Sequence, residues 1–323
     1  MKNKISIIIV DYNTIEKTFA YIDELNAKVK PKCCFNIIIV DNTEYRVSES
    51  WINGRSNFRI LEAKSFGGVD SILGMYNGID VVVCFADNNV GYGKGNNIGF
   101  NVEMELFSNE YVIFSNNDLL LDKDLDVDLL LKPFDDDRVA IVGPSVLDIT
   151  GIEHQNPYKY ISFWQYTVVN FYHMLSDKLF FFFEPNIDYD GRSKECYWVS
   201  GCFMVVRSRD FRRVGGFDER VFLYGEEVIL SERLLRIGKT CYFNNNVEIV
   251  HNHSSVVRSN MSEVERMRLS AKASRYYFRE YKHVCKLKII VADLLFEIFV
   301  PLFLLKNIIK KLVRSNLTTK SSK

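Results

Sequence analysis

Four short apolar runs, each leading to an aspartate, constrain the fold of this chain more than any other feature. They are Ile5–Val10 before Asp11, Asn36–Val40 before Asp41, Val81–Phe85 before Asp87, and Tyr111–Phe114 before Asp118. Continuous β-branched runs of this kind predict strands that are buried on both faces. Helical patterns lie between runs, as in Ile15–Lys28 and Gly95–Leu106. Alternating strands and helices predict an α/β fold with a doubly wound, mostly parallel sheet and flanking helices.

The four aspartates also predict where a ligand would bind. The carboxyl ends of parallel strands meet at one edge of a sheet, and open α/β sheets bind their ligands beyond that edge. We therefore expect Asp11, Asp41, Asp87 and Asp118 to converge there.

The remaining pattern predicts shorter elements. We expect strands over Phe58–Leu61, Val139–Val142, Tyr197–Val206, Thr240–Phe243 and Val247–Val250, and helices over Arg207–Val214, Glu226–Ile237 and Glu263–Lys282. The strand at Val139 should stop at Gly143-Pro144, and residues 145–195 are predicted to be irregular.

Composition limits the class of protein. The 323 residues carry 41 basic and 41 acidic side chains, so the net charge gives no general argument for nucleic-acid binding. Seven cysteines, an odd number without a C-x-x-C pair, predict a reduced intracellular protein with structural thiols. The first apolar run is short and ends at Asp11, which favours a first strand over a signal peptide.

Two adjacent glutamates mark a candidate catalytic position. The segment Gly215–Glu227 begins with a Gly-Gly turn and ends at Glu226 and Glu227, where a helix should begin. Carboxylates at a helix start are stabilised by its free N–H groups, which would make the pair purely structural. The alternative is that one of them is a general base held on a rigid element.

Polar residues after other strands are candidates for binding. Ser115–Asp118 is either a polar turn or part of a ligand site. The loop Asn88–Gly99 has four glycines in nine residues, which allow a ligand to approach the backbone closely. Its position and spacing exclude a Rossmann dehydrogenase, and a nucleotide or sugar pocket fits better. His251 is either a hydrogen-bonded core residue or shares Mg²⁺ or Mn²⁺ with Asp118.

In order and spacing, these segments resemble the family 2 inverting glycosyltransferases with the GT-A fold, especially their bacterial rhamnosyltransferase-like branch. Each segment is degenerate alone, but the set is specific and extends over roughly residues 5–280. The matching segments are Ile7–Asn13, Ile39–Asn42, Asn89–Gly99, Asn116–Asp118, Trp198–Cys202, Gly215–Glu227 and His251–Ser255.

The resemblance implies a role for individual residues. Asp118 and His251 would hold Mg²⁺ or Mn²⁺, which neutralises the leaving diphosphate. Glu227 would be the catalytic base, and Glu226 would position the acceptor or support that base. Asp41 would contact the pyrimidine base. The substrate-binding positions would be Tyr12, Asn13, Asp41, Asn89, Gly91, Asn97, Asn117, Trp198, Ser200 and Gly201.

The chain departs from the family pattern at two motifs. The metal motif reads Asn116-Asn117-Asp118 and has one carboxylate. The family's E-D-V-D-L reads Glu-Glu-Val-Ile-Leu here, so the second acid is longer by one methylene and Ile229 replaces the later aspartate. Whether Glu226 or Glu227 is the base, and whether His251 or His253 binds metal, is left open.

The reaction implied by the resemblance is a single displacement with inversion. The base takes the proton of an acceptor hydroxyl, which attacks C1 of the sugar as nucleoside diphosphate leaves. The donor would be dTDP-rhamnose or a UDP-hexose, and the acceptor a lipid-linked saccharide in O-antigen or capsule synthesis. The alternatives are a non-catalytic nucleotide-sugar-binding protein and a sugar nucleotidyltransferase. The latter needs a Gly-rich basic loop where this chain has Asp11–Thr14.

The C-terminal segment predicts a helix on a membrane surface. A helix over the 17 residues Ile289–Leu305 would span about 25 Å, short of the ~30 Å hydrocarbon core. Basic residues at both ends favour a helix lying on anionic lipid, and a core-packing or oligomer-forming helix is the alternative. We expect a GT-A domain over 1–282, an amphipathic segment over 283–314 and a disordered tail over 315–323. The expected location is cytoplasmic, peripheral on the inner face of the plasma membrane, with a homodimer left open.

Overall fold

The computed structural model describes residues 5–30, 35–167, 187–252 and 261–320. The chain divides into two compact units. Unit 1 comprises Met1–Lys159 and Ile187–Met261, and unit 2 comprises Tyr160–Asn186 and Ser262–Lys323.

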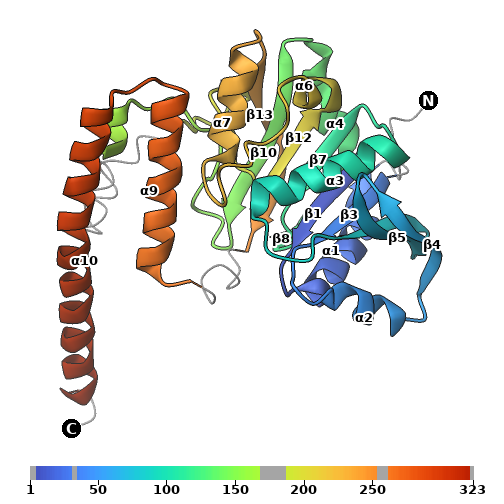
Figure 1. Ribbon diagram of the computed structural model, residues 1–323, viewed down its shortest axis with the longest axis horizontal. Helices are drawn as coiled ribbons and strands as arrows, with labels where there is room; N and C mark the ends of the chain where they lie inside the picture. Colours follow the sequence, from blue (N-terminus) through green and yellow to red (C-terminus); the bar gives the residue numbers. More distant parts are fainter. Residues whose placement is uncertain (1–4, 31–34, 168–186, 253–260, 321–323) are drawn as a thin grey trace. The chain divides into compact units, whose positions relative to one another are not determined.

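Unit 1 is built on a mixed β-sheet with helices on both faces (Figure 1). In the described part of the chain this sheet has 11 strands in the order β11-β13-β10-β12-β7-β1-β3-β6-β5-β4, with β8 beside β13. The central strands β7, β1, β3 and β6 are parallel, so the predicted α/β class is confirmed. The strands are β1 (Ile5–Asp11), β3 (Phe35–Asp41), β4 (Phe58–Phe66), β5 (Val69–Tyr76), β6 (Ile79–Phe85), β7 (Tyr111–Ser115), β8 (Leu119–Leu120), β10 (Val139–Asp148), β11 (Lys194–Cys196), β12 (Phe203–Arg207) and β13 (Thr240–His251). A separate pair joins β2 (Val29–Lys30) to β9 (Leu125–Asp126).

The strands supply two hydrophobic cores because successive side chains point to opposite faces of the sheet. Ile7 and Ile9 of β1 belong to the core beneath α1 (Ile15–Lys28), α2 (Val47–Asn53) and α4 (Val127–Leu131). Ile8 belongs to the core beneath α3 (Tyr92–Leu106), α6 (Ser208–Arg213) and α7 (Glu226–Leu235). A short 3₁₀ helix, η1, covers Lys132–Asp135. The sequence predicts the bounds of α1 correctly.

A hairpin that the sequence analysis does not predict extends one side of the sheet. The short strand expected over Phe58–Leu61 is longer, and β4 turns at Gly67-Gly68 into the antiparallel strand β5. Both glycines have positive φ, at 59° and 81°, as the tight turn of a hairpin requires. A second such turn, at Asn77-Gly78, joins β5 to β6.

Three other expectations are wrong. Strand β10 does not stop at Gly143-Pro144 but continues to Asp148, because a register shift after Pro144 accommodates the missing N–H. The two strands expected after Thr240 are one strand, β13. Residues 197–202 are not part of a strand. They form a loop before β12, because their backbone groups bond outside any strand ladder. Ser200 N–H donates to Asn156 Oδ1, and the carbonyl of Cys202 accepts from Asn116 N–H.

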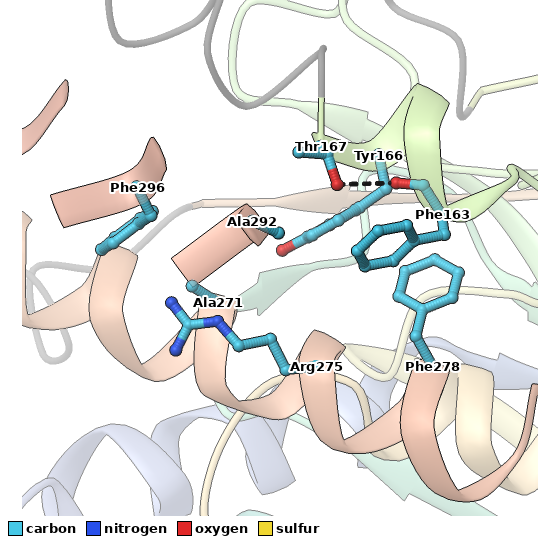
Figure 2. Close-up of a pocket in the computed structure, with 8 residues that line it drawn as sticks. All are labelled: Phe163, Tyr166, Thr167, Ala271, Arg275, Phe278, Ala292 and Phe296. Carbon is cyan, nitrogen blue, oxygen red and sulfur yellow. Dashed lines mark hydrogen bonds between the residues drawn. The ribbon is translucent and has the colours of Figure 1, made fainter. Parts of the chain in front are cut away.

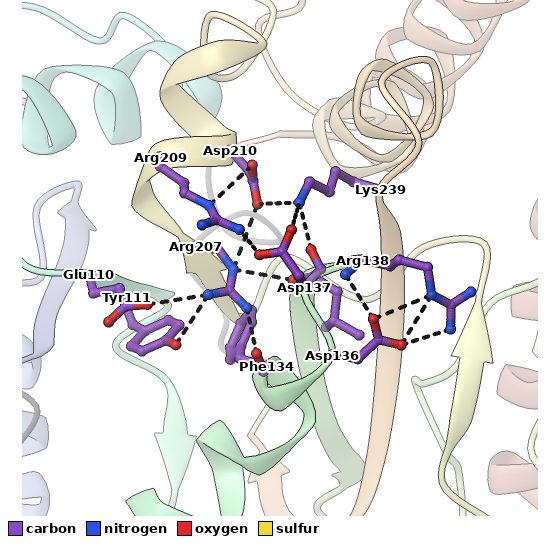
Figure 3. A network of polar contacts seen from close by, with 11 residues as sticks. Glu110, Tyr111, Phe134, Asp136, Asp137, Arg138, Arg207, Arg209, Asp210 and Lys239 are labelled. Carbon is purple, nitrogen blue, oxygen red and sulfur yellow. Dashed lines mark hydrogen bonds and ion pairs between the residues drawn. The ribbon is translucent and has the colours of Figure 1, made fainter.

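A buried ionic cluster holds β12 at its far end (Figure 3). Arg207 is 4 % exposed and donates to the Phe134 carbonyl at 2.6 Å and to Glu110 at 3.2 Å. Asp210 lies 3.7 Å from Arg207 and 3.5 Å from Lys239, so both signs of charge are matched in the interior. This anchoring fixes the strand that follows the loop 197–202.

Unit 2 contains two long helices, α9 (Glu263–Glu280) and α10 (Lys286–Lys320). Ser262 and Glu265 form a reciprocal capping box at the start of α9. Helix α10 includes residues 315–320, for which the sequence predicts a tail. The division into domains at 282 and 314 stays a prediction.

Candidate active site

The four strand-end aspartates lie at the same edge of the sheet, but three of them are engaged in local structure. Asp11 accepts hydrogen bonds from Thr14 Oγ1 at 2.9 Å and Thr18 Oγ1 at 2.5 Å. Asn117 Nδ2 joins the same group and lies 3.2 Å from Asp11 and 2.7 Å from Thr18 Oγ1. Asn117, a predicted substrate ligand, is therefore held by the first strand and helix.

Asp41 and Asp87 hold the segment after β3. Asp41 is 1 % exposed and accepts from the backbone N–H and the hydroxyl of both Thr43 and Ser48. Asp87 forms an ion pair with Arg46 at 2.6 Å. A contact between Asp41 and a pyrimidine base stays a prediction. The Asp41 carboxylate already accepts four hydrogen bonds from Thr43 and Ser48. Tyr12, half-buried, and Asn13, exposed with φ 58°, follow β1 at this edge.

The glycine-rich loop is clamped on two sides. Asn42 donates to Asn89 Oδ1 at 3.0 Å and accepts from Val90 N–H at 2.9 Å. Gly91 has φ 89°, and a Cβ there would lie 2.3 Å from the Phe222 carbonyl oxygen. This position requires glycine because the loop Gly215–Glu227 passes directly against it.

Asn97 makes the second clamp. Its side-chain oxygen accepts from Phe217 N–H at 2.9 Å, and its nitrogen donates to the Phe217 carbonyl at 3.0 Å and to Glu219 at 3.1 Å. Gly91 and Asn97 therefore hold the glycine-rich segment against the segment that leads to the glutamates, and Asn89 ties it to Asn42.

The Gly201–Cys202 segment is the centre of the site. Gly201 N–H donates to Glu227 Oε1 at 3.1 Å, and the Gly201 carbonyl accepts from Tyr92 Oη at 2.6 Å. A Cβ on Gly201 would lie 2.3 Å from Glu227 Oε1, so only glycine leaves room for this carboxylate. The side chain of Cys202, the next residue, hydrogen-bonds to His251.

The two glutamates begin α7, as the sequence predicts, and burial disfavours their charged forms. Glu226 is 1 % exposed, and its Oε1 accepts no hydrogen bond from the described residues. Burial raises the pKa of Glu226 above its ordinary value, and the charge of Glu227 raises it further. Burial also raises the pKa of Glu227, which is half-buried, although the hydrogen bond from Gly201 N–H lowers it. A carboxylate with a raised pKa is suited to accept a proton near neutral pH.

Asp118 and His251 form the other half of the site. His251 Nε2 lies 3.2 Å from Asp118 Oδ1, and His251 Nδ1 lies 2.9 Å from Gln155 Oε1. Burial alone would lower the pKa of His251, but the bonds to Asp118 and Cys202 raise it to about 10. Strand β13 ends at His251 directly beside β8, which begins after Asp118, and this pairing brings the two side chains together.

This pair fits a divalent cation with few protein ligands. Gln155 Oε1 can accept the Nδ1 proton of His251, so Nε2 is the nitrogen that faces the Asp118 carboxylate. A cation bound by both side chains would replace the proton that the raised pKa of His251 places on Nε2. Across the described residues, no cluster of three or more His, Cys, Asp or Glu side chains could hold a metal. A cation here would therefore take its other ligands from diphosphate oxygens and water, as Mg²⁺ often does. His253 lies outside the described residues.

The loop 197–202 also presents an aromatic surface. Trp198 is stacked on Tyr158, with ring centroids 3.7 Å apart and an angle of 6°. Ser200 N–H donates to Asn156 Oδ1 at 2.7 Å. Trp198, Ser200 and Gly201 thus share one loop, which residues 156–158 support.

Sequence reasoning missed several residues of this site. Tyr92 lies within the glycine-rich loop, but nothing in the sequence indicates that its hydroxyl reaches Gly201. Gln155, Asn156 and Tyr158 lie in the region that the sequence analysis treats as irregular. The amide pair Gln155-Asn156 is the only local signal there, and an amide pair is common in surface loops.

Comparisons with known proteins show similarity to glycosyltransferases. No protein-family model matches the chain. Over 54 residues it is 43 % identical to N-acetylglucosaminyl-diphospho-decaprenol L-rhamnosyltransferase of Mycobacterium tuberculosis, a match that covers 17 % of this chain and 18 % of that protein. Over 215 residues it is 27 % identical to rhamnosyltransferase WbbL of Escherichia coli, covering 64 % of this chain and 75 % of that protein. The chain is thus similar in sequence to two rhamnosyltransferases, and its fold is that of the GT-A glycosyltransferases.

Solved glycosyltransferase structures share the fold of this chain. GalNAc-T7, solved with UDP, GalNAc and Mn²⁺, matches with a TM-score of 0.56 and 14 % identity over 87 % of this chain and 49 % of its own. Mannosyltransferase PcManGT of Pyrobaculum calidifontis, solved with GDP-Man and Mn²⁺, matches with a TM-score of 0.54 and 12 % identity over 91 % and 69 %. The matched region spans under a fifth of the mycobacterial relative and about half of GalNAc-T7.

Proposed function

We propose that this chain is an inverting, metal-dependent hexosyltransferase. One observation carries the proposal: Glu227 and the Asp118–His251 pair flank the same two residues, Gly201 and Cys202. A base on one side and a site for a cation on the other are what a displacement at a sugar carbon requires.

In this mechanism Glu227 acts on the acceptor. Its carboxylate takes the proton of an acceptor hydroxyl, the oxygen forms a bond to C1 of the sugar, and the bond from C1 to the diphosphate oxygen breaks. The electron pair of that bond leaves with the nucleoside diphosphate, and C1 is inverted. Asp118 and His251 would hold the Mg²⁺ or Mn²⁺, which supplies positive charge to the leaving diphosphate. Glu226, beside the base, would position the acceptor or support the base.

The substrates are proposed from the relatives. Two of them are named as rhamnosyltransferases, and one is named for a saccharide on diphospho-decaprenol. We therefore favour dTDP-rhamnose as donor, with a UDP-hexose as second choice, and a lipid-linked saccharide in O-antigen or capsule synthesis as acceptor. An acceptor of this kind would place the enzyme in the cytoplasm, at the inner face of the plasma membrane.

A donor screen tests the function. The chain is incubated with dTDP-rhamnose, UDP-hexoses or GDP-mannose and a lipid-diphosphate saccharide, and the product is identified by mass spectrometry. NMR of the new linkage should show an anomeric configuration opposite to that of the donor. Retention of configuration would contradict the single displacement, and no sugar transfer from any donor would contradict the proposed function.

Chelation should remove the activity. EDTA is expected to abolish most transfer, and Mn²⁺ or Mg²⁺ should restore it, because the leaving diphosphate needs a counter-charge. Asp118→Asn should require more metal for the same rate, whereas the exposed Asp122→Asn should not. Full activity in EDTA, or equal metal dependence of the two variants, would contradict the assignment of Asp118.

Tyr92 is expected to hold the base in place through Gly201. Burial, with the charges of Glu227 and Cys202, raises the pKa of the Tyr92 hydroxyl, so the hydroxyl stays protonated and donates. Tyr92→Phe removes the hydrogen bond to Gly201 and should lower kcat about tenfold with little change in the donor KM. Tyr76→Phe is the control, because its hydroxyl bonds to Asp23 at 3.0 Å, outside the site. Equal kcat values for the two variants would show that Tyr92 has no such role.

A further inference from the structure

Helix α10 has two faces, and one of them is fully used within unit 2. Ala292, Phe296, Val300 and Phe303 lie on this inner face and are at most 9 % exposed. Phe296, Val300 and Phe303 form a cluster with Ala271 of α9. Figure 2 shows the same side of the helix, where Ala292 and Phe296 line a small pocket together with Phe163, Tyr166 and Phe278. This face has its packing partners within the chain.

The opposite face of α10 is apolar and exposed. Its residues recur every three or four positions, which places them in one stripe along the helix. Leu287 is 70 % exposed, Leu294 61 % and Ile298 60 %, and the stripe is completed by Ile290, Val291, Leu302, Leu305 and Ile308. From Leu287 to Ile308 the stripe is about 30 Å long at 1.5 Å per residue. Exposed apolar surface of this extent marks an interaction site.

The two acidic residues of this segment are paired with helix α9. Asp293 forms an ion pair with Arg275, and Glu297 forms one with Arg268 at 3.0 Å. Arg275 also lies over the ring of Phe296, 5.4 Å from its centroid. Their negative charges are therefore compensated by partners on α9, and every residue of the stripe itself is uncharged.

Positive charge borders the stripe at both ends. Lys286 and Lys288 flank Leu287, and Lys306 follows Leu305. In the sequence, Lys310, Lys311 and Arg314 continue the helix after Ile308. None of the helices in the described part of the chain combines the length and the hydropathy of a membrane-spanning segment. An apolar stripe bordered by cations, on a helix that does not span, is complementary to an anionic bilayer surface.

We propose that the stripe of α10, Leu287 to Ile308, is the face that enters an anionic membrane surface. The helix lies in the plane of the interface, with its apolar side chains among the acyl chains and its lysines at the phosphates. The ion pairs with α9 keep Asp293 and Glu297 from opposing this contact. The inference rests on the proposed function only in that a lipid-linked acceptor explains why the enzyme needs a bilayer.

Vesicle sedimentation with the full chain tests the proposal without any substrate. The chain should sediment with phosphatidylglycerol vesicles and much less with phosphatidylcholine vesicles. The double variant Leu294→Asp and Ile298→Asp should lower the partition at least about tenfold, because charges cannot enter the acyl region. The control is Ile149→Asp with Ile152→Asp, which changes the charge equally at residues that are 63 % and 77 % exposed in unit 1.

Two outcomes would overturn the proposal. One is equal sedimentation of the stripe variant and the wild type. The other is a wild-type dimer in gel filtration that the stripe variant dissociates, with no vesicle binding, which would make a second copy the partner. Sugar transfer to a short-chain soluble acceptor is measured in parallel. If transfer fails in the wild type while vesicles bind, the proposed function is wrong and the membrane face stands.

Discussion

Replacing Glu227 with glutamine should remove most sugar transfer and leave donor binding unchanged. Glutamine has nearly the same shape, and its side-chain oxygen can keep the hydrogen bond from Gly201 N–H, so the site should stay folded. What it loses is the ability to take a proton. General base catalysis is typically worth about 10²–10⁴-fold, and we expect kcat to fall by that factor. Turnover is measured by mass spectrometry and donor affinity by calorimetry.

The pH profile and a second variant make this result specific. A base acts when it is deprotonated, so the raised pKa of Glu227 means that the wild-type rate should increase with pH above the ordinary glutamate range. The residual rate of Glu227→Gln should lack this increase. Glu226→Gln should reduce the rate less, because Glu226 would act only through its neighbour. If Glu226→Gln is the more damaging variant, the base is Glu226.

Gly201→Ala should be nearly as damaging, although Gly201 takes no part in the chemistry. A Cβ at this position would lie 2.3 Å from Glu227 Oε1 and 3.0 Å from both Cδ and Cγ of Glu227. The end of a flexible side chain can move aside, so the fold should survive and the carboxylate should be displaced. A displacement of about 1 Å in a reacting group can cost about 10²-fold in rate.

Gly54→Ala is the matched control for this substitution. Gly54 has φ −85°, and its added Cβ would meet only backbone oxygens at 3.6 Å, an ordinary contact. Both variants should melt at temperatures close to that of the wild type in a thermal unfolding scan. Only Gly201→Ala should lose kcat. A Gly201→Ala enzyme with full turnover would show that Glu227 does not need this position.

The parts of the fold that sequence predicts best are those with a strong local pattern. The β-branched runs of β1, β3, β6 and β7 fit a strand and no other element. The aspartates that follow these strands lie at one edge of the sheet, as expected for parallel strands. Helix α1 has a full amphipathic pattern, and its bounds are as expected. The start of α7 at Glu226 follows a Gly-Gly turn and an acidic pair, both of which are local helix-start signals.

The parts that sequence reasoning missed depend on partners far along the chain. Strand β5 mixes exposed and buried residues and contains Gly74, so its own pattern does not indicate a strand. It pairs with β4 and β6 through turns at Gly67-Gly68 and Asn77-Gly78, which the sequence analysis does not predict. The loop 197–202 has the β-rich composition of a strand, but Asn156 and Glu227 take its N–H groups. The sequence also gives no sign that Thr43 and Ser48 hydrogen-bond to the Asp41 carboxylate, and the role of Asp41 as a ligand stays a prediction.

The same dependence governs the candidate site. Asp118 and His251 are 133 positions apart, and their meeting depends on the pairing of β8 with β13. The resemblance to a family predicts that they share a function, but the chain between them contains no signal for Gln155. Only the folded arrangement shows that the imidazole is oriented from its other side.

The clamp made by Asn97 has a consequence for engineering donor choice. One amide side chain ties the segment expected to recognise the nucleotide sugar to the turn that precedes the glutamates. Substitutions in the two segments should therefore be non-additive, as expected for residues that share one hydrogen-bond network. Exchanging specificity with a relative would then require transferring both segments together with Asn97, because either segment alone would lack its hydrogen-bond partner.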